Sequence, residues 1–364
     1  MELDGKIAFL RERNHGDDSE IFTMRPDGTQ VTQLTNNIEQ EENLAWTPDG
    51  SKIVFLREVY VGKSLDTEPS FFRMNADGSD EARLRTPMTH RSTGIGLDVD
   101  WSPDGSKIAF VRDMLVSTNL ARATIFLMNA DGSDQTQLCP ETKRWEDSPD
   151  WSPDGSKIAF VRTDDGGSQI YTVNADGTGL TQLTRDPAYT TDSPEWSPDG
   201  SKVLFSAYHK DVGEFGPDSG DNYDVFVMNA DGSGVQNLTD KPEFNDTEPT
   251  WSPDGRDIAF VRGSLHGEAP RRSPDYRGAD SEIWRMGADG SLPTRLTRNS
   301  VYDFDPVWQP IPSAARTSNA ATAGGATVVG DSLAPSGGRS LLLPASTLLT
   351  GMGVLIYAVL RRFV

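Results

Sequence analysis

Six acidic side chains recur at matching places and are the first candidates for chemistry in this sequence. Each stands three or four residues before a tryptophan that returns along the chain, and together they are Glu42, Asp98, Asp147, Asp192, Glu248 and Asp305. Carboxylates gathered at one place attract cations, whether metal ions or the basic groups of a protein. The alternative is that each acid caps a strand and bonds nearby backbone as part of the repeat.

The histidines are the second candidates for chemistry. All four (His15, His90, His209 and His266) fall in segments expected to be loops, and His15, His209 and His266 would together offer imidazoles to a transition metal. Polar residues belong in loops in any case, so we expect no metal. The sequence also has no phosphate-binding glycine loop, CxxC pair or nucleophile triad, so we expect no cofactor.

The net charge of the chain restricts its possible partners, and its cysteine content restricts its disulfides. The chain of 364 residues has 34 Lys and Arg against 55 Asp and Glu. A surface of that sign repels nucleic acid, so we exclude it as a ligand, whereas a basic protein patch remains a candidate partner. With Cys139 as the single cysteine, no disulfide can form within the chain.

A tryptophan marks one position of a repeat that fills the first 310 residues. The six markers lie 55, 50, 45, 55 and 57 residues apart: Trp46, Trp101, Trp151, Trp196, Trp251 and Trp308. A second marker lies between them, as "NADG" at 75, 129, 174 and 229, "RPDG" at 25 and "GADG" at 287. A period of about 50 residues is typical of propellers and other repeat architectures.

Each unit predicts four short antiparallel strands. The first strand ends in the tryptophan, and "SPDG" then turns the chain, with glycine where a positive φ is needed. The second strand, such as "SKIAFVR", is almost continuously apolar, which indicates burial on both faces. "NADG" is a second tight turn, between the third strand and a short fourth strand. Such a unit is typical of a β-propeller blade, whose apolar faces are buried against its neighbours.

The two ends of the repeat predict how the ring closes. The sequence begins with a second strand, "DGKIAFLRER", that lacks a first strand, and residues 303–309 are a first strand without a successor. Joined, they complete a split first blade and give an all-β, six-bladed propeller over residues 1–312 with no open edge. An open solenoid of the same repeats is the alternative.

The stretch "DSPDWSPDGSKIAFVRTDDGGSQIYTVNADGTGLTQLT", at 147–184, resembles the TolB-like, WD-related propeller repeat. The resemblance implies a fold used mostly in protein-binding modules. Related propellers accompany hydrolase domains, and others are polysaccharide lyases, so fold alone does not choose the function. This sequence contains no G-x-S-x-G nucleophile motif.

The C-terminal region has a different composition. Residues 313–340 are rich in Ala, Ser, Thr and Gly and predict a flexible, disordered stalk. Residues 341–360 carry no charge and are long enough for one transmembrane helix, which gives a membrane segment over 341–364. Arg361 and Arg362 follow it, so the positive-inside rule places the propeller outside the cell.

The sequence offers more than one mode of anchoring. "LAPSGG", from Leu333 to Gly338, resembles the LPxTG motif of a sortase signal but departs from it at two positions, so we expect a plain membrane anchor rather than wall attachment. "MELDGKIAFL" is not a signal peptide, which suggests that translation starts upstream. A tail-anchored protein with a cytoplasmic propeller is the alternative.

These observations predict a non-enzymatic binding module on the surface of a bacterial cell, tethered through 341–360. Its ligand would be a protein or an envelope component, bound on the face where loops vary in length, as at 207–222 and 263–281. The alternative is a metal-dependent polysaccharide lyase or hydrolase acting on that same face. Metal analysis of the purified protein separates the two, because the binding module requires no stoichiometric transition metal.

Overall fold

The computed structural model describes residues 5–13, 18–60, 67–84, 98–117, 120–139, 144–164, 167–186, 189–209, 223–264 and 281–311. The chain divides into two compact units, Met1–Asn319 and Ala320–Val364. The predicted stalk at 313–340 and membrane segment at 341–364 lie outside the described residues, as do His15, His90 and His266. No helix among the described residues is long and apolar enough to cross a membrane.

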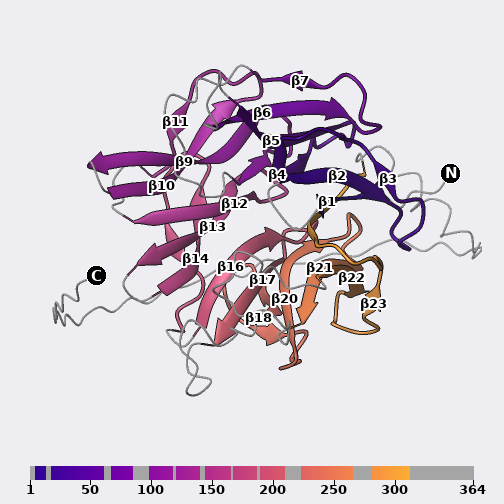
Figure 1. Cartoon of the computed structure of the whole chain (residues 1–364). Coiled ribbons are helices and arrows are strands. Elements are labelled where there is room, and N and C mark those ends of the chain that lie inside the picture. The colour runs from indigo at the N-terminus through magenta and orange to yellow at the C-terminus, as the bar shows by residue number, and fades with distance from the viewer. Residues whose placement is uncertain are drawn as a thin grey trace, which may run out of the picture. The chain divides into compact units, whose positions relative to one another are not determined.

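Six four-stranded antiparallel sheets make up the described part of the first unit, and they confirm the predicted propeller (Figure 1). The blades, each from its inner to its outer strand, are: blade one, β24 (Asp303–Trp308), β1 (Ile7–Arg13), β2 (Asp18–Met24) and β3 (Thr32–Gln33); blade two, β4 (Gln40–Trp46), β5 (Lys52–Tyr60), β6 (Thr67–Asn75) and β7 (Ala82–Arg83); blade three, β8 (Val99–Trp101), β9 (Lys107–Ser117), β10 (Leu120–Asn129) and β11 (Thr136–Gln137); blade four, β12 (Trp145–Trp151), β13 (Lys157–Asp164), β14 (Gly167–Asn174) and β15 (Thr181–Gln182); blade five, β16 (Tyr189–Trp196), β17 (Lys202–His209), β18 (Tyr223–Asn229) and β19 (Gln236–Asn237); blade six, β20 (Phe244–Trp251), β21 (Asp257–Ser264), β22 (Glu282–Gly287) and β23 (Thr294–Arg295).

The Ser-Pro-Asp-Gly turns owe their shape to a carboxylate and a glycine. In blade four, the Asp154 carboxylate accepts hydrogen bonds from the Ser156 amide (2.9 Å) and the Ser152 hydroxyl (2.7 Å). These bonds hold the pKa of Asp154 below its usual value. Gly155 then adopts a φ of 71°, and its amide donates to the Ser152 carbonyl at 2.8 Å. The predicted positive φ of the turn glycine is therefore confirmed.

Replacing Gly155 with valine is expected to destabilise the propeller by about 1–3 kcal/mol, because a β-branched residue is strained at positive φ. A Cβ at this position would meet only the Pro103 Cδ, at 3.8 Å, which is an ordinary contact, so the Cβ itself is not crowded. Chemical denaturation measures the destabilisation. Gly155→Asn is the control, since asparagine tolerates this conformation; equal losses in both variants would contradict the strain argument.

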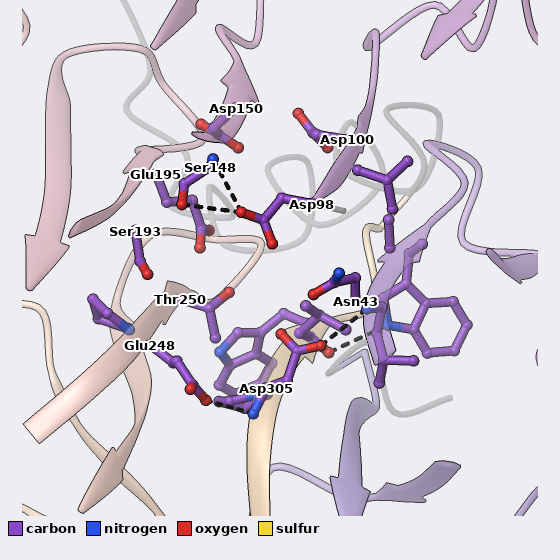
Figure 2. Close-up of a pocket in the computed structure, with 18 of the residues that line it drawn as sticks. Asn43, Asp98, Asp100, Ser148, Asp150, Ser193, Glu195, Glu248, Thr250 and Asp305 are labelled. Atoms are coloured by element: carbon purple, nitrogen blue, oxygen red, sulfur yellow. Dashed lines mark hydrogen bonds between the residues drawn. The ribbon is translucent and has the colours of Figure 1, made fainter. Parts of the chain in front are cut away.

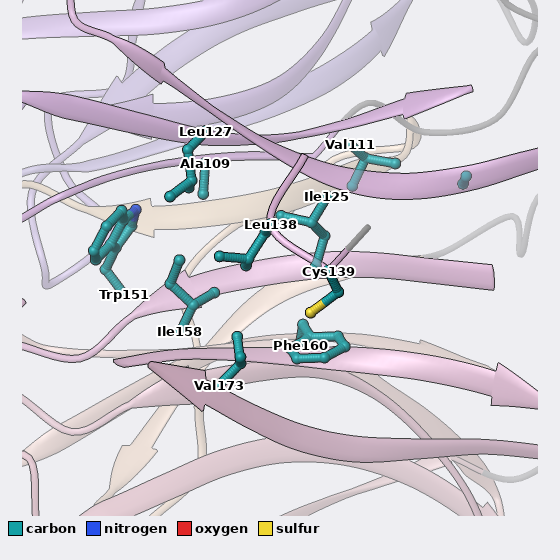
Figure 3. Close-up of a cluster of buried hydrophobic side chains, with 11 residues drawn as sticks. Ala109, Val111, Ile125, Leu127, Leu138, Cys139, Trp151, Ile158, Phe160 and Val173 are labelled. Atoms are coloured by element: carbon teal, nitrogen blue, oxygen red, sulfur yellow. The ribbon is translucent and has the colours of Figure 1, made fainter. Parts of the chain in front are cut away.

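The hydrophobic core lies between blades rather than within one. Between blades three and four, Val111 and Ile125 on one sheet face Ile158 and Phe160 on the next, and all four are almost fully buried (Figure 3). Clusters of the same kind recur between the other blades. Each blade thus depends on its neighbours for stability, which is why the ring has to close.

The ring closes as predicted. β24, from the end of the propeller sequence, pairs with β1 from its beginning, with Trp308 opposite Ile7 and Val307 opposite Ala8. The Gln309 amide then donates to the Lys6 carbonyl at 2.8 Å. No inner edge of blade one is left open.

An ion pair joins the inner strand to the second strand in four blades, and its acid is buried in each. The acid stands five residues before the tryptophan and lies directly opposite an arginine in the strand register. The pairs, with N–O distances of 2.6–2.7 Å, are Arg11–Asp303, Arg57–Glu41, Arg162–Glu146 and Arg262–Asp246. In blade five, Thr191 and Ala207 occupy the two positions, so both partners are replaced together.

Candidate functional site

A β-bulge in the inner strand determines which of its residues face the channel. In blade four, Asp147 pairs with Val161 and Asp150 with Ala159, so Ser148 and Pro149 together lie opposite Phe160. The same irregularity occurs in blades one, two, five and six. The first bulged residue has a φ of 49–53° in each: Asn43, Ser148, Ser193, Glu248 and Asp305. Because the bulge breaks the alternation of faces, successive residues of the strand can line the channel.

These inner strands enclose a pocket of about 280 Å³ in the channel, here called the hub pocket. Its wall consists of the three residues that precede the tryptophan in all six blades (Figure 2). Trp46, Trp251, Trp308 and Pro310 also line it. In every blade the inner strand therefore lines the channel.

Six carboxylates line the hub pocket, at two positions of the repeat. The upper acids stand three residues before the tryptophan and are Asp98, Glu248 and Asp305; the lower acids stand one residue before it and are Asp100, Asp150 and Glu195. In blades four and five, where the upper position is serine, the lower one is acidic. In blades six and one this is reversed, since Thr250 and Val307 occupy the lower position.

Each lower acid binds the next blade. The Trp151 amide donates to Asp100 Oδ2 at 2.7 Å, the Trp196 amide to Asp150 Oδ2 at 2.6 Å, and the Trp251 amide to Glu195 Oε1 at 2.9 Å. These bonds cross from blade three to four, four to five and five to six. The lower acids therefore position the tryptophans as well as giving the pocket its charge.

The upper acids also reach the next blade (Figure 2). Asp98 Oδ2 accepts from the Ser148 amide at 3.0 Å and its hydroxyl at 3.1 Å. Glu248 Oε2 accepts from the Asp305 amide at 2.6 Å, and Asp305 Oδ2 accepts from the Leu44 amide at 2.9 Å. Bonding to backbone, one of the two roles considered for the acids from the sequence, is thus present for these three.

Burial raises the pKa of all six carboxyl groups. It brings the pKa of Asp100 and Asp305 to about 7, and that of Glu195 and Glu248 to about 8. The pKa of Asp98 is raised by burial, and that of Asp150 is raised well above its usual value by burial and by the charges of Asp100 and Glu195. The hub pocket therefore holds several protons near neutral pH.

Stability is expected to fall as the pH rises from 5 to 8. A carboxyl group whose folded-state pKa lies above its unfolded value of about 4 binds more protons in the folded state in this interval, so raising the pH favours unfolding. Melting temperatures measured across this range test the sign. Glu195→Gln, which keeps an acceptor for the Trp251 amide, should flatten the dependence and raise the melting temperature at pH 8. An unchanged profile in this variant would contradict the assignment.

The structure separates the six acids predicted from the sequence into two groups. Asp98, Glu248 and Asp305 line the hub pocket. Glu42, Asp147 and Asp192 stand four residues before the tryptophan, one position earlier, and are not among the pocket-lining residues. Burial raises the pKa of all three, and the charge of Asp98 adds to the effect.

The lower acids were not among the site residues predicted from the sequence. Their signal was an acid directly before the tryptophan, in "VDW", "PDW" and "PEW".

The predicted histidines lie largely outside the described residues. His209 ends β17, but its side chain is not described, and the other three histidines lie wholly outside the described residues. Among the described residues, no group of three His, Cys, Asp or Glu side chains has an arrangement suited to a metal ion. The expected absence of a metal stays a prediction.

Comparison with known proteins agrees with this architecture. A family model described as the TolB beta propeller domain matches residues 57–211. TolB from Acinetobacter baumannii superposes with a TM-score of 0.64 at 20% identity, over 84% of this chain and 67% of that one. The fold is a TolB-like β-propeller. A putative TolB from Agrobacterium tumefaciens gives a TM-score of 0.57 at 20% identity, over 85% of this chain and 92% of that one.

Similarity in sequence is more local. The Tol-Pal system protein TolB of Rhizorhabdus wittichii is 34% identical over 93 residues, which is 25% of this chain and 18% of that protein. The match thus covers less than a fifth of the length of this relative. A chain of the Nidogen/Laminin complex shares the fold with a TM-score of 0.59 at 11% identity, over 84% of this chain and 98% of that one. The propeller fold thus occurs in proteins of different kinds, and the fold alone does not show a function.

Proposed function

We propose that this TolB-like propeller is a non-catalytic binding module that takes a cationic group of a protein, or of another envelope component, into the hub pocket. The observation that carries the proposal is the convergence of six carboxylates on one pocket of about 280 Å³. TolB-like propellers commonly mediate protein binding, which supports a protein as the partner.

The charge state of the pocket favours a cation over a neutral ligand. Burial raises the pKa of these carboxyl groups, and repulsion by neighbouring carboxylates raises that of Asp150 and Glu195 further, so the groups retain protons. An ammonium or guanidinium group that enters the pocket removes this repulsion and displaces protons. The volume suits a single side chain or a chain end rather than a folded element.

The proposed setting is outside the cell. Residues 313–340 would serve as a flexible stalk and 341–360 as the membrane span, with Arg361 and Arg362 on the cytoplasmic side. The composition of these segments supports this assignment. Protease added to intact cells would then release the propeller, whereas a cytoplasmic propeller would be cut only after lysis.

A lysine-containing peptide, and the same peptide with norleucine in place of lysine, form a direct probe of the pocket. Calorimetry with the full chain at pH 7.5 should show binding of the first only, weakened by salt and accompanied by proton release. Asp150→Asn/Glu195→Gln should weaken it at least about tenfold. Asp154→Asn/Asp199→Asn, which changes two turn acids outside the hub pocket, is the control. Equal binding by both double variants would contradict the proposal.

A further inference from the structure

We infer that a cavity between the turns of blades five, six and one is a second binding site, which takes a carboxylate group of an acidic protein segment. The cavity has a volume of about 920 Å³ and is here called the turn-face cavity, because the Ser-Pro-Asp-Gly turns of blades five and six form most of its wall. Trp251 and Trp308 line both this cavity and the hub pocket, but the charged side chains of the two are different. The second site therefore does not depend on what the hub pocket binds.

The first observation is that blade six departs from the repeat where it forms this cavity. Serine and lysine follow the Pro-Asp-Gly turn in blades two to five, whereas Arg256 and Asp257 follow it in blade six. The second turn begins with asparagine in blades two to five and with Gly287 in blade six. In blades two, three and four the lysine Nζ donates to this asparagine, at 2.6, 3.4 and 3.1 Å. Blade six has thus lost a bridge that the repeat uses elsewhere, and it places different charges in the cavity wall.

Arg285 takes part in the arrangement that replaces this bridge. Its Nη2 donates to Asp257 Oδ2 at 2.7 Å, and its Nη1 donates to the Pro26 carbonyl of blade one at 3.3 Å. The guanidinium group is therefore held across the interface between blades six and one, and it lines the cavity. A guanidinium group has five N–H donors, so these bonds leave donors for a ligand.

The second observation is that other donors of the wall are unused. The Lys202 Nζ has no hydrogen bond or ion pair with any residue that the structure describes. Arg256 is exposed, and its 3.6 Å contact with Asp254 is a surface ion pair of little strength. The indole N–H groups of Trp251 and Trp308 are buried without an acceptor in the described part of the chain.

The acids of the same wall, in contrast, already accept hydrogen bonds. Asp199 Oδ1 accepts from the Ser197 hydroxyl at 2.7 Å and from the Ser201 amide at 2.9 Å. Asp254 Oδ1 accepts from the equivalent serine hydroxyl of blade six at 2.8 Å, and Asp257 is paired with the arginine described above. The wall thus has more free donors than free acceptors. A ligand that brings acceptors, and above all an anionic one, satisfies it best.

The distribution of charge also favours an anion at this place. The basic and acidic side chains of the wall are equal in number: Lys202, Arg256 and Arg285 against Asp199, Asp254 and Asp257. The chain as a whole has a net charge of −21, and among the described residues six carboxylates and no lysine or arginine line the hub pocket. An acidic group is therefore repelled by the hub pocket and meets far less repulsion in the turn-face cavity.

The size and the apolar part of the wall favour a segment of chain over a small ion. Pro26, Pro198, Pro253 and Ile311 line the cavity beside the charged side chains. A volume of about 920 Å³ is at the upper end of the range of ligand pockets, so it has room for several residues. TolB-like propellers commonly mediate protein binding, which supports a protein as the source of the carboxylate.

Two short peptides with blocked ends test the inference on the full chain. The first is Ac-Gly-Glu-Gly-Glu-Gly-NH2, and the second has glutamine in place of glutamate. Calorimetry at pH 7.5 should show binding of the glutamate peptide only, and salt should weaken it. Equal binding of both peptides, or binding of neither, would overturn the inference. Inorganic phosphate is titrated in the same way, and tighter binding of phosphate than of the glutamate peptide would assign the cavity to a phosphate ligand instead.

A matched pair of double variants tests whether the peptide binds in this cavity. Lys202→Gln/Arg256→Ser removes two exposed cations of the wall, and serine is the residue that blades two to five have in place of Arg256. Lys107→Gln/Lys157→Gln removes two cations at the same turn position of blades three and four, outside the cavity wall. The first variant should bind the glutamate peptide about tenfold more weakly, as expected for the loss of two exposed ion pairs, and the second within about twofold of the unaltered chain. Equal weakening in both variants, or unchanged binding by the first, would overturn the assignment to this cavity.

Discussion

Deletion of residues 303–312 is expected to remove the cooperative unfolding transition of the propeller, or to lower its stability by at least about 5 kcal/mol. Loss of the buried Trp308 side chain alone should cost about 3–5 kcal/mol. The deletion also uncovers β1, where Ile7 and Phe9 are fully buried, and leaves its backbone unpaired. Circular dichroism and light scattering would report unfolding and aggregation.

Moving the strand provides the control for this deletion. Residues 303–308 can be placed before Lys6 through a Ser-Pro-Asp-Gly-Ser turn, with the chain ended at 302, which gives blade one the connectivity of blade four. The rearranged chain should regain a cooperative transition, because the strand register is restored. A simple deletion that melts like the full chain would show that the ring does not need β24.

Loss of one partner of a buried ion pair is expected to have the second large effect. Arg262→Ala and Asp246→Thr should each cost about 3–5 kcal/mol, because a charge is left buried without its partner. Burial already raises the pKa of Asp246 despite the opposing effect of Arg262, which shows how strongly the site penalises the isolated charge. Arg262 also lies over the Phe260 and Trp284 rings, at 5.2 and 4.9 Å.

The double variant shows whether the two side chains contribute to stability as a pair or independently. Asp246→Thr/Arg262→Ala copies the pair that blade five carries naturally, Thr191 and Ala207. It should be less destabilised than either single variant, a coupling that denaturant titration of all four proteins measures. A double variant that loses the sum of the two single effects would mean that the side chains act independently.

The blades could be predicted because their signals are local. Proline, aspartate and glycine specify the turns at fixed offsets, and the recurring tryptophan gives the period. The split blade followed from two incomplete units. The sequence predicted the fold of 1–312 for these reasons, and the structure confirms it over the residues it describes.

Only half of the carboxylates that line the hub pocket could be predicted, because the β-bulge in the inner strand has no clear signature in the sequence. Its first residue adopts positive φ without being glycine, as at Ser148 and Glu248, and nothing in the local sequence announces that. Acids three and four residues before the tryptophan were therefore predicted as one set, although they occupy two different positions of the strand. Asp147 and Asp98, which look equivalent in the sequence, differ in whether they line the pocket.

The carboxylates that bridge neighbouring blades are unevenly distributed around the ring, so the interfaces between blades, here called seams, are not equivalent. Two of them, Asp98 and Asp100, accept backbone hydrogens across the seam between blades three and four. Across the seam between blades two and three, the described residues at the same two positions are Asn43 and Ala45. Ionisation at high pH therefore charges two bridging carboxylates between blades three and four and none at these positions between blades two and three. Under alkaline conditions we expect the propeller to open first at the interface between blades three and four. The least stable part of the ring therefore need not be blade one, where β24 pairs with β1 to close it.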